Sequence, residues 1–162
     1  MLHDVDNALR FAASAHGGQQ DKAGDPYILH VARVGASLWR FSNDFVIAGF
    51  LHDVVEDTPY TLDDLERFGA HPRVVQAVDS VTKRPYEPHE AAVRRAMEDP
   101  IGLWVKAADV LDNASRTLEL EDEELRGRLE VKYARAVEVL RERLPGLRVG
   151  GALRPGGERQ GG

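Results

Sequence analysis

The chain has 162 residues, no cysteine and a formal net charge of −6 at pH 7. This length suits one domain with an adequate core, and the lack of cysteine excludes disulfides, thiolate zinc sites and a cysteine nucleophile. The acidic balance argues against nucleic acid as a partner, and neither a signal-like start nor a run of ~20 apolar residues is present, so we expect a cytoplasmic protein without a membrane partner.

The spacing of apolar residues predicts helices along nearly the whole chain, and therefore an all-α fold. Acidic caps, prolines at first turns and glycines after last turns mark where these helices begin and end. We find no convincing strand pattern. The expected helices lie at about residues 4–16, 26–42, 44–56, 61–69, 72–82, 89–98, 101–115 and 122–144.

Two of these helices are expected at the centre of a bundle. The segment 44–56 is apolar on most sides, which is typical of a buried helix, so it would deliver His52 and Asp53 from the core. The segment 101–115 is also apolar but holds Asp109 in its middle. A charge there is costly unless it is paired or bound to a metal.

The chain divides into a helical domain, residues 1–146, and a Gly-rich tail, residues 147–162. The tail has few large apolar residues, so we expect it to be disordered. Within the domain, Trp39 and Trp104 fall on apolar stretches and are expected in the core.

The segment Leu51–Thr58 carries the chemistry that stands out most. His52 and Asp53 offer an imidazole nitrogen and a carboxylate oxygen, a pair suited to a divalent metal. On a continuous helix Glu56 lies four residues beyond His52. Asp57 likewise lies four beyond Asp53, which brings a second acidic pair onto the same face. Crowded acids need a cation or a shared proton, so the segment indicates a metal with a general base beside it. The alternative is a helix end with solvated acids and one packed histidine.

Further metal-capable side chains interrupt other apolar helices. Three separate helices each carry at least one such side chain. Several polar side chains on otherwise apolar helices favour one common site over a set of unrelated buried polar residues. We therefore predict a metal site between core helices. Its candidate ligands are His30, His52, Asp53 and Asp109.

Several short motifs resemble the HD-domain metal phosphohydrolases. More narrowly, they resemble the (p)ppGpp hydrolase domain of RelA/SpoT homologues and the small stand-alone alarmone hydrolases. The resemblance covers roughly residues 5–140. The motifs are Pro26–His30, Leu51–Thr58, Phe68-Gly69, Val81–Lys83 and Val105–Asp109 followed by Asn113.

The resemblance implies an HD-domain helical bundle in which His30, His52, Asp53 and Asp109 hold one divalent ion, commonly Mn²⁺. It also implies that Glu56 and Asp57 position or deprotonate the attacking water. The implied reaction removes the 3′-pyrophosphate of (p)ppGpp and gives GDP or GTP and pyrophosphate. Such an ion lowers the pKa of water and neutralises charge on the attacked phosphate.

The substrate-binding residues match the family less completely. We expect Lys22 to meet a phosphate, Asn113 to face the sugar or phosphate, and Tyr133 to reach over the pocket. Relatives commonly carry a basic residue that packs on guanine at the position of Asp21. A carboxylate cannot stack in this way, so a loose preference for the base is expected.

Two further departures and two alternative functions remain open. Val110 stands where a basic residue is usual, and Asp112 stands where an aromatic residue or histidine is common. One alternative is a phosphatase of another nucleotide, acting on the 2′-phosphate of NADPH or on a nucleoside monophosphate. The other is a non-catalytic nucleotide-binding HD module, against which Glu56 and Asp57 speak. The oligomeric state is left open.

Overall fold

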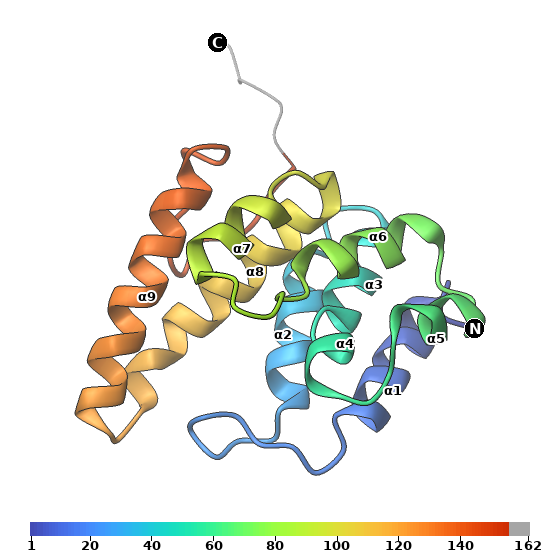
Figure 1. Ribbon diagram of the computed structural model, residues 1–162, viewed down its shortest axis with the longest axis horizontal. Helices are drawn as coiled ribbons and strands as arrows, with labels where there is room; N and C mark the ends of the chain where they lie inside the picture. The colour runs from blue at the N-terminus through green and yellow to red at the C-terminus, as the bar shows by residue number, and fades with distance from the viewer. Residues whose placement is uncertain (156–162) are drawn as a thin grey trace.

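The computed structural model describes residues 1–155, and these fold into a bundle of helices (Figure 1). No strand is present in this part of the chain; a single bridge joins Gln20 and Pro26. None of the helices described is long and apolar enough to cross a bilayer. The helices are α1 (Val5–Ala15), α2 (Ile28–Ser37), α3 (Asn43–Leu51), α4 (Val54–Asp57), α5 (Leu62–Arg67), α6 (Pro72–Val81), α7 (His89–Ala96), α8 (Pro100–Arg116) and α9 (Glu123–Arg141), with a 3₁₀ turn, η1 (Thr117–Glu119), before α9.

Helix α3 lies at the centre of the bundle, as its sequence predicts. It packs against α1, α2, α6 and α8, and Ile47 and Leu51 are fully buried. Helices α2 and α3 approach closely because each places a glycine at the crossing. A Cβ on Gly49 would lie 2.8 Å from the Cα of Gly35, and a Cβ on Gly35 would lie 2.2 Å from the ring of Phe50. This close crossing brings the polar ends of the two helices together.

The expectation of one continuous helix over 44–56 is wrong at His52 and Asp53. Helix α3 ends at Leu51 and α4 begins only at Val54, with a turn between them. The ring of His52 explains the break, because its Nδ1 lies 2.7 Å from the carbonyl oxygen of Gly49. In an uninterrupted helix this carbonyl accepts from the amide of Asp53, and a side chain that competes for it breaks the ladder.

The expected end of the second helix is also wrong. Helix α2 ends at Ser37, and the next residue, Leu38, is fully buried whereas Trp39 is 66% exposed. Trp39 therefore lies outside the core, with the guanidinium of Arg40 4.6 Å from its ring. The expectation for Trp104 is confirmed, because it packs against the buried cluster.

The segment after α9 differs from the disorder expected of residues 147–162. Leu147 and Leu153 are only 7% and 6% exposed and belong to the core cluster. They lie with Trp104 and Leu144 around one apolar depression. The segment up to residue 155 therefore packs on the bundle, and the remainder of the expected tail lies outside the described residues.

We expect Leu153→Ala to lower the free energy of unfolding by about 1.5–3 kcal/mol, because it returns a buried leucine surface to water. For a chain of this size the midpoint of thermal unfolding should fall by roughly 5 °C. A chain that ends after Leu147 should lose at least as much. Leu118→Ala is the control, since Leu118 is 75% exposed and should melt like the wild type. Equal melting of all four proteins would show that the segment after Leu147 adds nothing to stability.

Candidate metal centre and nucleotide cleft

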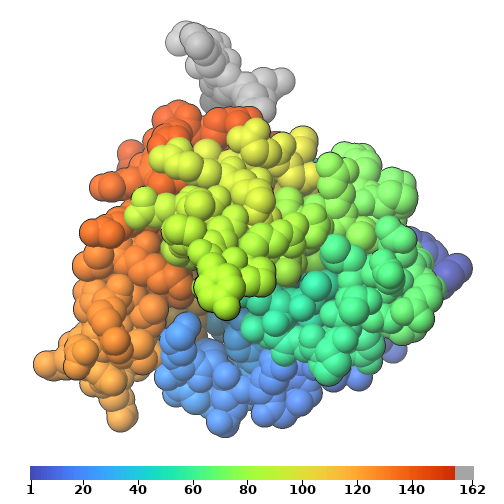
Figure 2. Space-filling view, in the orientation of Figure 1, coloured from blue at the N-terminus to red at the C-terminus, as the bar shows by residue number. Residues whose placement is uncertain are grey.

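A cleft of about 340 Å³ opens beside the centre of the bundle, a size typical of small-molecule sites. Its walls come from the loop before α2, from α4, from the C-terminal part of α8 and from α9. In Figure 2 the surface is indented where the blue segment near residue 20 faces the orange α9. His30, Tyr27 and Asp57 line one part of this cleft.

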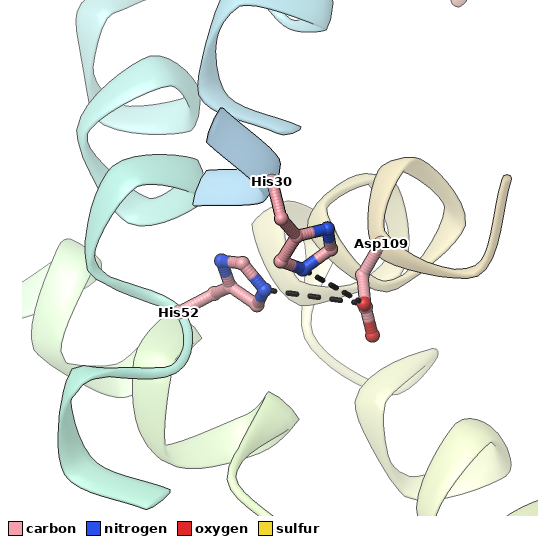
Figure 3. A group of neighbouring side chains, drawn as sticks. All are labelled: His30, His52 and Asp109. Atoms are coloured by element: carbon pink, nitrogen blue, oxygen red, sulfur yellow. Dashed lines mark ion pairs between the residues drawn. The ribbon is translucent and has the colours of Figure 1, made fainter. Parts of the chain in front are cut away.

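Three metal-capable side chains converge next to the cleft (Figure 3). His30 comes from the first turn of α2, His52 from the turn after α3, and Asp109 from the middle of α8. One ligand atom of each lies within 4.8 Å of the others. Oδ1 of Asp109 is 3.6 Å from Nε2 of His30 and 3.9 Å from Nε2 of His52. The helices thus bring together three of the four ligands expected from the sequence.

Hydrogen bonds behind the two rings fix which nitrogen faces this cluster. Nδ1 of His52 lies 2.7 Å from the carbonyl oxygen of Gly49, and Nδ1 of His30 lies 2.8 Å from Oδ2 of Asp112. Both partners accept, so in each neutral ring Nδ1 carries the proton and donates it. Nε2 of each ring therefore presents a lone pair to the cluster, the arrangement found in metal-binding histidines.

Asp53, the fourth expected ligand, lies against both rings. Its Oδ2 is 2.8 Å from Nε2 of His52 and 3.5 Å from Nε2 of His30. Nε2 of His52 is nevertheless buried without an aligned hydrogen bond to any described residue. Lone pairs that face one another at this distance need a cation or a proton beside them. Two imidazole nitrogens and two carboxylates form a donor set that fits a divalent cation.

The pKa values of these groups reflect how strongly the cluster favours positive charge. Burial lowers the pKa of His30, but Asp112, Asp53 and Asp109 outweigh burial and raise this pKa to about 10. Burial raises the pKa of Asp53, yet the positive charges of His52 and His30 beside it hold this pKa well below its usual range. The cluster therefore stabilises positive charge, either as protons on the imidazoles or as a metal ion.

Asp109 is itself held by two neighbours on α8. Nζ of Lys106 donates to its Oδ2 at 2.9 Å, and Nδ2 of Asn113 donates to its Oδ1 at 2.6 Å. The sequence predicts that a charge in this helix must be paired or metal-bound, and the pairing with Lys106 is observed. Asn113, which was expected to contact the substrate, lines the cleft and orients Asp109.

The two expected catalytic acids lie just beyond the cluster, on the short helix α4. Oε2 of Glu56 accepts the backbone N–H of Lys83 at 2.9 Å. Oδ2 of Asp57 is 3.2 Å from the hydroxyl of Tyr27, and Asp57 lines the cleft. Burial, followed by the charges of Asp53 and Glu56, raises the pKa of Asp57. Such a carboxylate binds a proton more readily than an exposed one.

A hydrogen-bonded network supports Asp57 from the loop that precedes α2. Nε2 of Gln19 donates to the carbonyl oxygen of Asp57 at 2.9 Å, and the side-chain oxygen of Gln19 is 2.8 Å from Nδ1 of His16. His16 is 2% exposed. This network ties the first helix end to the acidic end of the cleft.

The remaining expected substrate contacts also line the cleft. Lys22 lies on the loop before α2, and Tyr133, only 5% exposed, lies on α9. Asp21 has a structural task in that loop, because its Oδ1 accepts the backbone N–H groups of Ala23 and Asp25 at 2.9 and 3.0 Å. The structure thus brings Lys22, Tyr133 and Asn113 to one cavity.

Two contributors to the site have weak local signals in the sequence. Lys106 precedes Asp109 by three positions, an ion-pair spacing on a helix that identifies it in retrospect. The hydroxyl of Tyr27 donates to Oδ2 of Asp53 at 2.6 Å. No spacing rule predicts this bond, because the two residues are 26 positions apart and precede different helices.

Asp112 and Arg33 form a pair that no sequence pattern predicts. Nε and Nη2 of Arg33 donate to the two oxygens of Asp112 at 2.6 and 3.0 Å, a bidentate and charge-assisted contact. The same carboxylate accepts from Nδ1 of His30. Asp112 therefore holds the ring of His30 in the orientation and tautomer that a metal ligand requires.

An all-helical core in which His30, His52 and Asp109 converge, with Asp53 against both rings, defines a helical domain with a candidate metal site. A family model described as the HD domain matches residues 8–135, and the chain belongs to this family.

This chain is similar to several curated proteins. It is 35% identical over 135 residues to the guanosine-3′,5′-bis(diphosphate) 3′-pyrophosphohydrolase of Aquifex aeolicus (strain VF5), with 78% of this chain and 19% of the relative covered. It is 39% identical over 141 residues to the GTP pyrophosphokinase of Streptomyces coelicolor, with 78% and 16% covered. The chain thus spans less than a fifth of the length of these curated relatives.

A solved structure matches over nearly its whole length. It is described as a metazoan ortholog of SpoT that hydrolyzes ppGpp and plays a role in starvation responses. The TM-score is 0.74 at 27% identity, with 89% of this chain and 96% of that chain covered. The match extends the family assignment to the arrangement of the whole domain.

We expect Asp112→Ala to weaken the binding of a divalent ion by about 10–100-fold, since His30 loses the group that orients it. Asp109→Ala should abolish stoichiometric binding. Titration with Co²⁺, followed by its visible absorption, measures the affinity without any substrate. Asp63→Ala, on the exposed side of α5, is the matched control and should bind like the wild type. Unchanged affinity in Asp112→Ala would show that the contact to His30 is dispensable.

Proposed function

We propose that this chain is a metal-dependent hydrolase that removes the 3′-pyrophosphate of (p)ppGpp, giving GDP or GTP and pyrophosphate. The observation that carries the proposal is the convergence of His30, His52, Asp53 and Asp109 beside a nucleotide-sized cleft lined by Asp57. The names of relatives and of the structural neighbour support the same reaction.

We propose one Mn²⁺ ion as the cofactor, held by the two histidines and the two aspartates. Mixed imidazole and carboxylate donors suit such an ion. When bound, it supplies Lewis acidity that neutralises charge on the phosphate and lowers the pKa of a water molecule.

The residues of the chain then have separate tasks. Asp57, whose carboxylate lines the cleft beside the hydroxyl of Tyr27, takes the proton of the attacking water. Glu56 is anchored by the backbone N–H of Lys83 and orients the water from the other side. Lys22 meets the phosphates. As the water oxygen bonds to phosphorus, the bond to the ribose 3′ oxygen breaks; this oxygen takes a proton from solvent, and Asp57 later releases the proton it accepted.

The test is a comparison of substrates with the Mn²⁺-loaded protein. The panel contains ppGpp, pppGpp, their adenine analogues, NADPH and nucleoside monophosphates, with the released product identified in each case. Pyrophosphate release from ppGpp or pppGpp is the expected result. Turnover of only NADPH or a monophosphate would overturn the proposal in favour of another nucleotide phosphatase. No turnover in metal-loaded protein would favour a nucleotide-binding module.

We expect Glu56→Gln and Asp57→Asn each to lower kcat for pyrophosphate release by ~10²-fold or more, the usual scale for the loss of a general acid–base group. Co²⁺ binding should persist in both, because neither carboxylate belongs to the proposed ligand set. Asp63→Asn is the control for an exposed acid outside the cleft and should keep full activity. Near-wild-type rates in both variants would remove these acids from the mechanism.

A further inference from the structure

Arg116, the last residue of α8, stands at the part of the cleft away from the metal ligands. Its Nη2 lies 3.4 Å from Oδ2 of Asp21, 2.5 Å from Oδ2 of Asp25 and 2.8 Å from Oε2 of Glu119. Three carboxylates from the loop before α2 and from η1 therefore fix the position of one guanidinium. The guanidinium offsets part of the negative charge of these three carboxylates.

All three contacts use the same nitrogen of the guanidinium. No described residue accepts a hydrogen bond from Nε or Nη1 of Arg116, although the side chain is only 21% exposed. An arginine held so firmly by one nitrogen has donors left for a ligand. Arg116 lines the same cleft as Asp57 and His30, so a ligand that reaches the metal centre can also reach these donors.

Leu120 and Leu129 line the same cleft as Arg116 and add an apolar wall to it. A nucleotide whose phosphates lie near His30 and Asp57 would place its base against this wall. Apolar walls accommodate any base, so selection among bases needs a polar group at the edge of the pocket.

We infer that Arg116 reads the base of the substrate and selects guanine. This inference rests on the proposed function. Nη1 carries two N–H donors, and guanine presents two neighbouring acceptors, O6 and N7, on one edge. Adenine presents a donor at position 6 and cannot accept both bonds. Arg116 is thus a specificity-determining residue, and it supplies from α8 a guanidinium that the loop position of Asp21 lacks.

The test compares guanine and adenine substrates in the wild type and in Arg116→Met. In the wild type kcat/KM for ppGpp should exceed that for ppApp by roughly ten-fold or more, the usual discrimination of a two-acceptor contact. Arg116→Met should bring this ratio close to one by raising KM for ppGpp more than KM for ppApp. Arg94→Met is the matched control, because Arg94 pairs with Glu142 on the surface. Its ratio should equal that of the wild type.

Base analogues locate the contact on the wild-type protein, so that the result does not depend on how a variant folds. The hypoxanthine analogue of ppGpp keeps O6 and N7 and should be used like ppGpp. The 7-deazaguanine analogue lacks N7 and should be used several-fold less well. Equal use of ppGpp, ppApp and the 7-deaza analogue would overturn the inference, as would an unchanged base ratio in Arg116→Met.

Binding separates this inference from the proposed reaction. GDP and ADP are compared by calorimetry on the Mn²⁺-loaded wild type. Tighter binding of GDP than of ADP, with no hydrolysis of any alarmone, would support the role of Arg116 and contradict the proposed reaction. Hydrolysis of ppGpp with no preference for GDP over ADP, or for ppGpp over ppApp, would support the proposed reaction and contradict the role of Arg116.

Discussion

A cluster of mutually repelling lone-pair donors is the constraint on which the rest of the structure depends. Two imidazoles and two carboxylates are held together inside an apolar bundle, where their mutual repulsion and their desolvation both oppose folding. The fold tolerates this only because each donor has a fixed partner behind it. Gly49, Asp112, Tyr27 and Lys106 supply those partners, and each bond also directs its ligand toward the common point.

The helical fold and the unusual polar residues inside it could be predicted from the sequence because both depend on local patterns, whereas the metal ligands stay a prediction. A buried helix is recognised by its apolar periphery, and a charge such as Asp109 is conspicuous within it. The capping box of Thr61 and Asp64 and the proline that opens α6 likewise appear where local rules place them. These features need no knowledge of which helices are neighbours.

The break at His52 could not be predicted, because its cause is a side chain that bonds to the backbone of its own helix. The burial of Leu153 has a similar explanation. Its segment is rich in glycine and forms no helix, so composition alone favours disorder. The apolar surface that it covers is formed by Trp104 and Leu144, far away in sequence. Packing across the bundle thus outweighs the local signal.

The departures from the family pattern become intelligible when they are considered as pairs. Asp112 and Asp21 are both acids where relatives carry other residues, and each meets an arginine from another element, Arg33 and Arg116 respectively. Each acid therefore has a cation beside it in the cleft. Replacing Asp112 by the family residue would leave Arg33 without its carboxylate and remove the bond from His30. Replacing Asp21 would leave Arg116 with Asp25 and Glu119 but remove the loop hydrogen bonds that Asp21 accepts. Such pairs should therefore change together, so the base preference of this cleft has to be judged from the guanidinium of Arg116 and not from the single position of Asp21.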